Sequence, residues 1–295
     1  MPPPSPELEK SLWKFDKLLK HPERAVTSWF TTPLILLIVR SIFLIYSLIT
    51  LATSIYLYDI HGQLYLFLTY YTNLGFIGLT AYFATAVVHS SVFMRYNVPK
   101  SLVLQPKMLT IAFWLLYDTI VLNHIVIPLV YWAFLAKTHT DEFGSSSHMG
   151  LVKFRTYSMH GVDFFMMIVE VLLSRMPLVS SHLIFVITVP ILYIFEIWIN
   201  YAINHTFPYE PLDWRRGKKV AGYYFGLLGI AICAFLIQKL IHLSRDAAGQ
   251  RLWRRGLMQE METYRRNGSS GVNRPNDNVD VVVVSAPEEI EIENI

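Results

Sequence analysis

Long apolar blocks are the feature that most constrains this chain. Each is long enough to cross the roughly 30 Å hydrocarbon core of a bilayer as a helix. Because lipid offers no partner to backbone polar groups, such segments must be helical. The blocks are Pro33–Tyr58, Leu64–Val88, Met108–Ala136, Tyr157–Val179, Leu183–Ile203 and Val220–Ile241. The sequence therefore predicts an all-α, polytopic membrane protein built as a six-transmembrane-helix bundle.

Composition agrees with a membrane protein. Only 16% of the residues are charged, against about 25% in soluble proteins. The net charge of +3 is too small to indicate a nucleic-acid partner. The single cysteine, Cys233, lies within an apolar block, so no disulfide framework is expected. We expect no cofactor and no metal, and the bilayer itself is the partner that the composition indicates.

Polar segments flank the membrane domain, which we place at residues 33–241. Residues 1–32 contain Leu8, Leu12, Phe15 and Leu19 on one helical face, which is typical of a short amphipathic helix on a membrane surface, with a solvated charged tail as the alternative. Residues 242–295 read as a basic helix to about Arg266 and then a disordered acidic tail.

The distribution of Lys and Arg predicts the orientation. If the N-terminus is inside, the inner helix ends carry twice as many basic residues as the outer ends, as the positive-inside rule requires. We therefore expect both termini in the cytosol, and an endomembrane such as the endoplasmic reticulum rather than the plasma membrane. The sequence does not specify an oligomeric state.

The fourth block carries ionisable residues on one face. In MHGVDFFMMIVEVLLS, His160, Asp163 and Glu170 lie at i, i+3 and i+10, which places them on a common stripe of a helix. Each costs about 2.5–3.5 kcal/mol in hydrocarbon, so the stripe should face inward. Arg40, seven residues into the first block after Pro33, is expected to snorkel or to pair with an acid such as Glu170.

Further blocks also carry polar side chains. Thr69, Thr72 and Asn73 lie in the second, Asp118 and His124 in the third, and Tyr193, Glu196 and Asn200 in the fifth. Polar residues can act as glue between helices, at about 0.6 kcal/mol per contact. Glue is usually Ser, Thr and Asn rather than acids and histidines, so we favour a functional cavity supported by Asn73, Asp163, Glu170 and Glu196.

A threonine nucleophile needs a base that accepts its proton and a group that orients the base. At a rise of about 1.5 Å per residue, Thr72, His160 and Asp163 all fall in the outer half of the membrane. Thr72 as nucleophile, His160 as general base and Asp163 as acid therefore form a candidate set, with Asn73 or Tyr71 as weaker candidates for the oxyanion donor.

Three stretches resemble a known family. They are FLTYYTNLGFIGLTAYF in the second block, HGVDFFMMIVE in the fourth, and Tyr193-Ile194 leading to YEPLDW at Tyr209–Trp214. Over about residues 30–240 the chain resembles the androgen-induced gene and androgen-dependent TFPI-regulating protein family of membrane threonine hydrolases, with its rolling-stone relatives, and is most similar to fungal members.

The resemblance implies a six-helix membrane enzyme with a catalytic threonine and a catalytic histidine. The family histidine falls on His160. Two residues compete for the threonine: Thr69 has the closer local match (FLT), whereas Thr72 has the better spacing to Tyr82 and the YTN form of the rolling-stone relatives. Thr72 is favoured. Glu210 departs from the pattern, since the family usually has proline there, and rolling-stone relatives act in cell fusion.

The expected function is hydrolysis of lipid esters, such as fatty acid esters of hydroxy fatty acids, inside the bilayer. Two alternatives remain at this stage. One is a proton-coupled carrier that uses Asp118, Asp163, Glu170 and Glu196 as a relay. The other is a multi-pass membrane protein without chemistry, whose polar residues only join helices.

Overall fold

The computed structural model describes residues 15–136 and 148–269. Within these ranges all regular structure is helical, and six helices are long and apolar enough to cross a membrane. The predicted all-α bundle of membrane-spanning helices is therefore confirmed. Its elements are α3 (Pro33–Ile60), α4 (Tyr71–Tyr96), α6 (Lys107–Val130) with the π-helix η3 (Tyr131–Leu135), α7 (Met149–Tyr157) with the π-helix η4 (Ser158–Val162) and α8 (Asp163–Leu173), α9 (Leu183–Asn204) and α10 (Lys219–Ser269).

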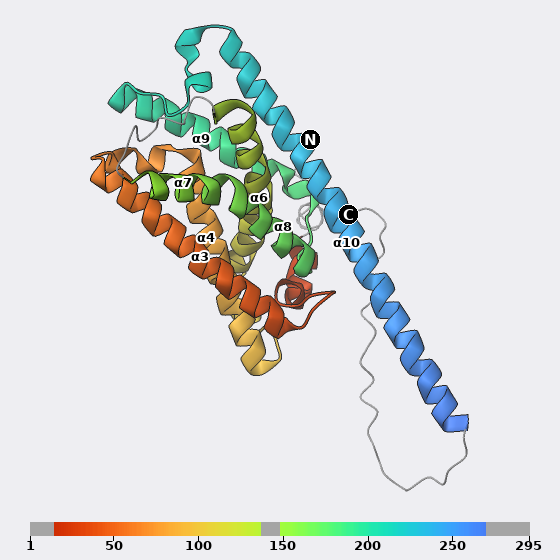
Figure 1. Cartoon of the computed structure of the whole chain (residues 1–295). Coiled ribbons are helices and arrows are strands. Elements are labelled where there is room, and N and C mark those ends of the chain that lie inside the picture. Colours follow the sequence, from red (N-terminus) through yellow and green to blue (C-terminus); the bar gives the residue numbers. More distant parts are fainter. Residues whose placement is uncertain (1–14, 137–147, 270–295) are drawn as a thin grey trace.

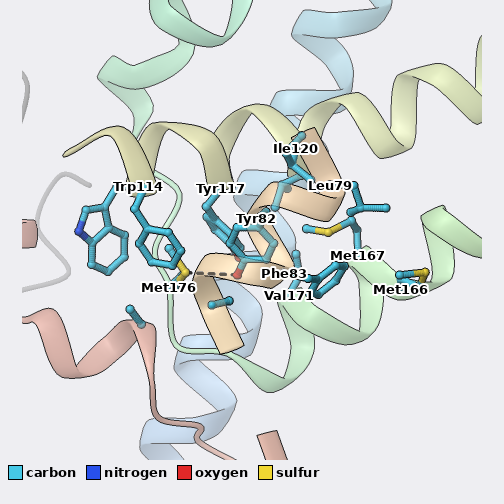
Figure 2. Close-up of a cluster of buried hydrophobic side chains, with 14 of the residues drawn as sticks. Leu79, Tyr82, Phe83, Trp114, Tyr117, Ile120, Met166, Met167, Val171 and Met176 are labelled. Carbon is cyan, nitrogen blue, oxygen red and sulfur yellow. Dashed lines mark hydrogen bonds between the residues drawn. The ribbon is translucent and has the colours of Figure 1, made fainter. Parts of the chain in front are cut away.

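Helix α6 forms the centre of the bundle (Figure 1). It packs against α4, α8, α9 and α10, whereas α3 lies along α4. The core between these helices is aromatic and thioether-rich, with Tyr82, Phe83, Trp114 and Tyr117 packed beside Met167 (Figure 2). Large apolar side chains on the outer faces of α3 and α9 are exposed, as they must be on surfaces that contact lipid.

The second expected span is interrupted at its start. Leu64–Thr69 form a 3-10 helix, η2, and Tyr70 is extended, with φ −92° and ψ 123°. Helix α4 then begins at Tyr71. The break separates the two threonines that compete for one role: Thr69 ends η2, and Thr72 lies in the first turn of α4.

The fourth span is shifted toward the N-terminus relative to the expected block. It begins at Met149 rather than Tyr157 and ends at Leu173 rather than Val179. The early start is possible because Arg155 is buried against polar partners, donating to Ser54 Oγ over 2.9 Å. The early end follows from Ser174, which is extended at ψ 164°, and from Pro177, which cannot supply a helical N–H.

Helix α10 is much longer than a span. Its 51 residues extend for roughly 75 Å, so it runs along the bundle and continues well beyond it (Figure 1). The expected boundary at residue 241 thus falls inside one continuous helix. Of the expected amphipathic helix, the structure describes only α2 (Phe15–Lys20), where Leu18 is buried in the bundle core; Leu8 and Leu12 lie outside the described residues.

Trp29 packs closely against α10 at Gly249. A Cβ on Gly249 would lie 2.6 Å from the Trp29 Cβ, and the Trp29 Nε1–H donates to Asp246 over 3.0 Å. Gly249→Ala should therefore displace Trp29 and cost about 1–3 kcal/mol, as overpacking usually does.

Gly256→Ala provides the matched control, because a Cβ on Gly256 meets open space in the same helix. It should leave stability unchanged or raise it by up to about 1 kcal/mol through helix propensity. Thermal melting of both variants in detergent, followed by size-exclusion chromatography, tests the contact. Equal melting temperatures for the two variants would contradict it.

Candidate active site

His160 occupies a kink in the fourth span. It lies in the π-helix η4 and has non-helical dihedrals, φ −133° and ψ 17°. Its ring is stacked on Tyr131, with centroids 3.6 Å apart and planes 3° apart, and the Trp132 Nε1–H donates to its carbonyl over 2.5 Å. Tyr131 and Trp132 belong to the π-helix η3, so two π-helical segments meet here. Such segments often mark functional sites.

Thr72 lies near the start of α4 and is half-buried. It is one turn before Gly75, on the same side of the helix, and a Cβ on Gly75 would lie 2.8 Å from Ile127 Cδ1 of α6. Tyr131 is one turn beyond Ile127. Thr72 therefore lies at the end of α4 that is nearest the Tyr131 end of α6. Among the described residues no hydrogen bond joins Thr72 to His160.

The Thr72 hydroxyl and backbone N–H are both available. Thr72 is half-buried, and no hydrogen bond of its hydroxyl or of its N–H is found among the described residues. The N–H belongs to the first turn of α4, where helical N–H groups lack intrahelical acceptors. An oxyanion placed there would also experience the positive end of the helix dipole.

Thr69, the competing threonine, uses both its hydroxyl and its carbonyl in hydrogen bonds. Its hydroxyl donates to the Leu66 carbonyl over 2.8 Å within η2. Its carbonyl accepts the Tyr193 hydroxyl over 2.7 Å, and the same Tyr193 oxygen accepts the Tyr71 N–H over 3.2 Å. This arrangement fixes the entry to α4 and leaves the Thr69 hydroxyl engaged, unlike that of Thr72.

Asp163 pairs with His124, not with His160. The Asp163 Oδ2 lies 2.7 Å from His124 Nδ1, and His124 Nε2 lies 3.3 Å from the Gly75 carbonyl. Both ring nitrogens thus face acceptors, so the pair is either an imidazolium with a carboxylate or a neutral imidazole with a protonated acid. His124 therefore has no nitrogen left to accept a proton from a nucleophile.

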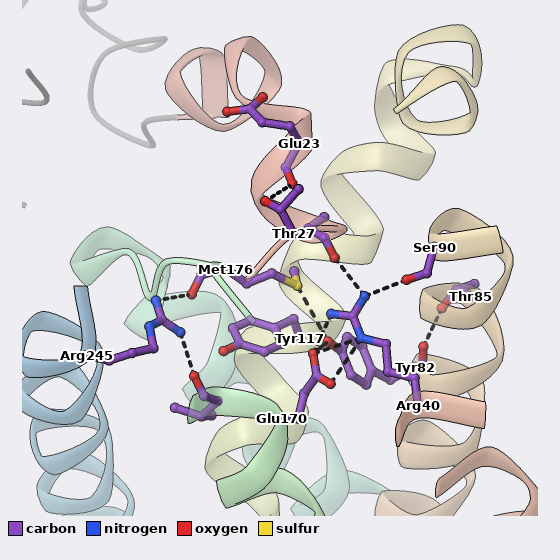
Figure 3. A network of polar contacts seen from close by, with 12 residues as sticks. Glu23, Thr27, Arg40, Tyr82, Thr85, Ser90, Tyr117, Glu170, Met176 and Arg245 are labelled. Carbon is purple, nitrogen blue, oxygen red and sulfur yellow. Dashed lines mark hydrogen bonds and ion pairs between the residues drawn. The ribbon is translucent and has the colours of Figure 1, made fainter. Parts of the chain in front are cut away.

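Glu170 pairs with Arg40, so of the two alternatives for Arg40, snorkelling or pairing with an acid, the structure has the pair (Figure 3). Arg40 Nη2 lies 2.5 Å from Glu170 Oε1, and the Tyr82 hydroxyl donates to the same oxygen over 2.8 Å. Arg40 Nη1 donates to Ser90 Oγ and to the Ala25 carbonyl, each over 2.8 Å. The network is fully buried and joins α3, α4 and α8.

Asn73 and Glu196 lie apart from these pairs. The Asn73 Nδ2 donates to the Phe67 carbonyl over 2.8 Å, and its Oδ1 accepts from Arg155 over 3.2 Å. The half-buried Glu196 lies on α9, where its Oε2 has no hydrogen-bond partner among the described residues. Asn73, Asp163, Glu170 and Glu196, which were expected to support one cavity, thus share no hydrogen bond or ion pair with one another among the described residues.

Neither expected side-chain oxyanion donor is available. The Asn73 amide is engaged as described, and the Tyr71 hydroxyl donates to Asn123 Oδ1 over 2.9 Å. Among the described residues no group of three or more His, Cys, Asp or Glu side chains could hold a metal ion.

Comparison of the chain with protein-family models, with curated proteins and with solved structures finds no match. The assignment of a function therefore depends on the residues and their geometry.

Proposed function

We propose that this protein is an integral membrane hydrolase of lipid esters, such as fatty acid esters of hydroxy fatty acids, with Thr72 as nucleophile and His160 as general base. One observation carries the proposal: a half-buried threonine, whose hydroxyl has no hydrogen bond among the described residues, lies at the N-terminus of α4, at the end nearest the stacked Tyr131–His160 pair. The resemblance to membrane threonine hydrolases supports the same two residues.

The reaction follows the acyl-enzyme scheme. Thr72 Oγ1 attacks the ester carbonyl carbon while His160 accepts the hydroxyl proton. The carbon–oxygen bond to the leaving alkoxide then breaks, and His160 returns the proton, so that a hydroxy fatty acid departs. Water attacks the acyl-threonine, giving its proton to His160, and the released Thr72 oxygen recovers that proton. The products are a hydroxy fatty acid and a fatty acid.

The Thr72 N–H is suited to stabilise the oxyanion. A donor fixed before the reaction is worth about 2.7–4 kcal/mol in other hydrolases, and this one lies at the N-terminus of the 26-residue helix α4. The Thr72 hydroxyl must still approach His160 when substrate binds. Catalytic hydrogen bonds are often long without substrate and shorten in the complex.

We further propose that both termini face the cytosol, in the membrane of the endoplasmic reticulum. Arg24, Arg175 and Arg245 gather at the end of the bundle where α3 begins and α8 ends. Basic residues concentrate on the cytosolic side of membrane proteins. With this orientation, Thr72 and His160 lie in the opposite, lumenal half of the bilayer.

Thr72→Ala should abolish labelling by a fluorophosphonate probe, because the probe phosphonylates an activated hydroxyl and Thr72 carries the nucleophilic one. Thr69→Ala is the matched control and should keep most of the labelling, since the Thr69 hydroxyl donates to Leu66. Mass spectrometry of the labelled wild type should place the adduct on Thr72. An adduct on Thr69, or normal labelling of Thr72→Ala, would refute the assignment.

The carrier alternative would rest on Glu196. Asp118 is paired with His182 over 2.5 Å, and Asp163 and Glu170 are paired as described. Glu196 is therefore the acid best placed to exchange protons. Proton flux in proteoliposomes that is lost in Glu196→Gln would favour a carrier over a hydrolase.

A further inference from the structure

Three arginines from distant segments gather at the end of the bundle where α3 begins, and two of them contact the carboxylate of Asp246. Arg24 Nη2 donates to Asp246 Oδ2 over 2.8 Å, and Arg245 Nε donates to Asp246 Oδ1 over 2.9 Å. Arg175, in the loop after α8, accepts the Arg24 Nε–H at its carbonyl over 2.9 Å. The cluster therefore brings together the segment before α3, the loop after α8, and α10.

Arg175 has no ion pair among the described residues. Its guanidinium stacks on Trp29, with Cζ 4.1 Å from the ring centroid, and its Nη1 donates to Thr27 over 3.2 Å. Its Nε is buried without a hydrogen-bond partner. Burial and the neighbouring charge of Arg24 hold the pKa of Arg175 below its ordinary value, while Glu23 and Asp246 oppose this effect. The Arg175 guanidinium thus keeps donor capacity that no described residue uses.

An apolar groove lies beside the cluster. It has a volume of about 420 Å³ and runs between α8 and α10, with Arg245 among its lining residues. Its other lining residues include Phe30, Leu172, Ile237, Leu240 and Ser244. Leu240 is 64% exposed, so the groove opens onto the surface that lipid covers.

We propose that this cluster and groove bind an anionic glycerophospholipid of the adjacent leaflet. The phosphate group contacts Arg175, supported by Arg24, and one acyl chain occupies the groove. Guanidinium groups bind phosphate through paired, charge-assisted hydrogen bonds. Basic pockets between membrane helices bind anionic headgroups for this reason, and a tryptophan such as Trp29 is typical of the headgroup level.

The lipid site is separate from the candidate active site. His160 lies at the kink inside the fourth span, and Arg175 lies just after the end of that span. Their separation of 15 residues in the sequence corresponds to roughly 20 Å along the helix axis. A bound lipid would tie together the three segments that carry the arginines. It should therefore stabilise the fold without contacting Thr72 or His160.

Thermal melting in detergent tests the proposal with dioleoyl phosphatidic acid as the probe. The wild type should melt several degrees higher with this lipid than with dioleoyl phosphatidylcholine, because binding to the folded state raises its stability. Arg175→Gln should weaken the binding by roughly tenfold or more, since charge-assisted hydrogen bonds are lost. Arg251→Gln is the control, because Arg251 is exposed on the part of α10 that follows the cluster. This variant should bind phosphatidic acid as the wild type does.

Two further arms separate lipid from free phosphate. Glycerol 3-phosphate, which lacks acyl chains, should give no shift, and Ser244→Phe should weaken phosphatidic acid binding by filling the groove. Arg175→Lys, which keeps the charge, should melt normally without lipid and bind with intermediate affinity. Equal shifts with both phospholipids, a full shift with glycerol 3-phosphate, or equal losses in Arg175→Gln and Arg251→Gln would each overturn the proposal.

Discussion

His160→Ala is expected to lower the hydrolysis of a fatty acid ester of a hydroxy fatty acid by at least about 100-fold, as is typical for loss of a positioned general base. The fold should survive. The stacking of His160 on Tyr131 is the kind of contact worth about 0.5–1.5 kcal/mol. Initial rates of the detergent-purified protein, normalised to the folded fraction from size-exclusion chromatography, provide the measurement.

His124→Ala is the informative control, because the same residue type is removed from the neighbouring helix. Here the expected loss is of stability, by about 3–5 kcal/mol, because Asp163 would remain buried without its partner. The folded fraction should hydrolyse the ester faster than His160→Ala does. Near-normal turnover of well-folded His160→Ala, together with inactive His124→Ala, would mean that the base has been assigned to the wrong histidine.

The membrane helices could be predicted because lipid imposes a simple rule on sequence. A span needs about 20 apolar residues. The number of spans and their approximate positions could therefore be read from the apolar blocks in the sequence. The inward direction of Asp163 and Glu170 followed from the cost of charge in hydrocarbon. The same cost predicted a partner for Arg40, and Glu170 supplies it.

The partner of Asp163 could not be predicted, because it depends on the rotation of one helix against another. A regular helix places His160 and Asp163 on one stripe, but the π-helix Ser158–Val162 alters the register at this point. His160 consequently stacks on Tyr131, while Asp163 meets His124. No local pattern in the sequence indicates the π-helix, and none indicates that His124 is the partner of Asp163.

The separation of Thr69 from Thr72 was also hidden in the sequence. Both lie in one apolar block, and only the extended residue Tyr70 shows that a 3-10 helix ends before α4 begins. The arginine cluster was invisible for a related reason. Arg24, Arg175 and Arg245 lie in three distant parts of the chain, where each looks like an ordinary basic residue at the end of a span.

Glu170→Gln should destabilise the protein severely. It removes the charge that compensates Arg40, and both side chains are fully buried (Figure 3). Breaking a buried ion pair by removing one partner typically costs about 3–5 kcal/mol, because the remaining charge is left uncompensated. For a chain of this size, the melting temperature should fall on the order of 10 °C.

Glu196→Gln makes the same chemical change where no ion pair exists among the described residues. A neutral amide is cheaper than a carboxylate at a half-buried membrane position, so this control should melt at or above the wild-type temperature.

Arg40→Leu combined with Glu170→Met should recover part of the loss from Glu170→Gln, because both charges leave together. The recovery should be incomplete, since Ser90 and the Ala25 carbonyl each lose a hydrogen-bond partner. If Glu170→Gln and Glu196→Gln melt at the same temperature, the Arg40–Glu170 pair does not hold α3 against α8.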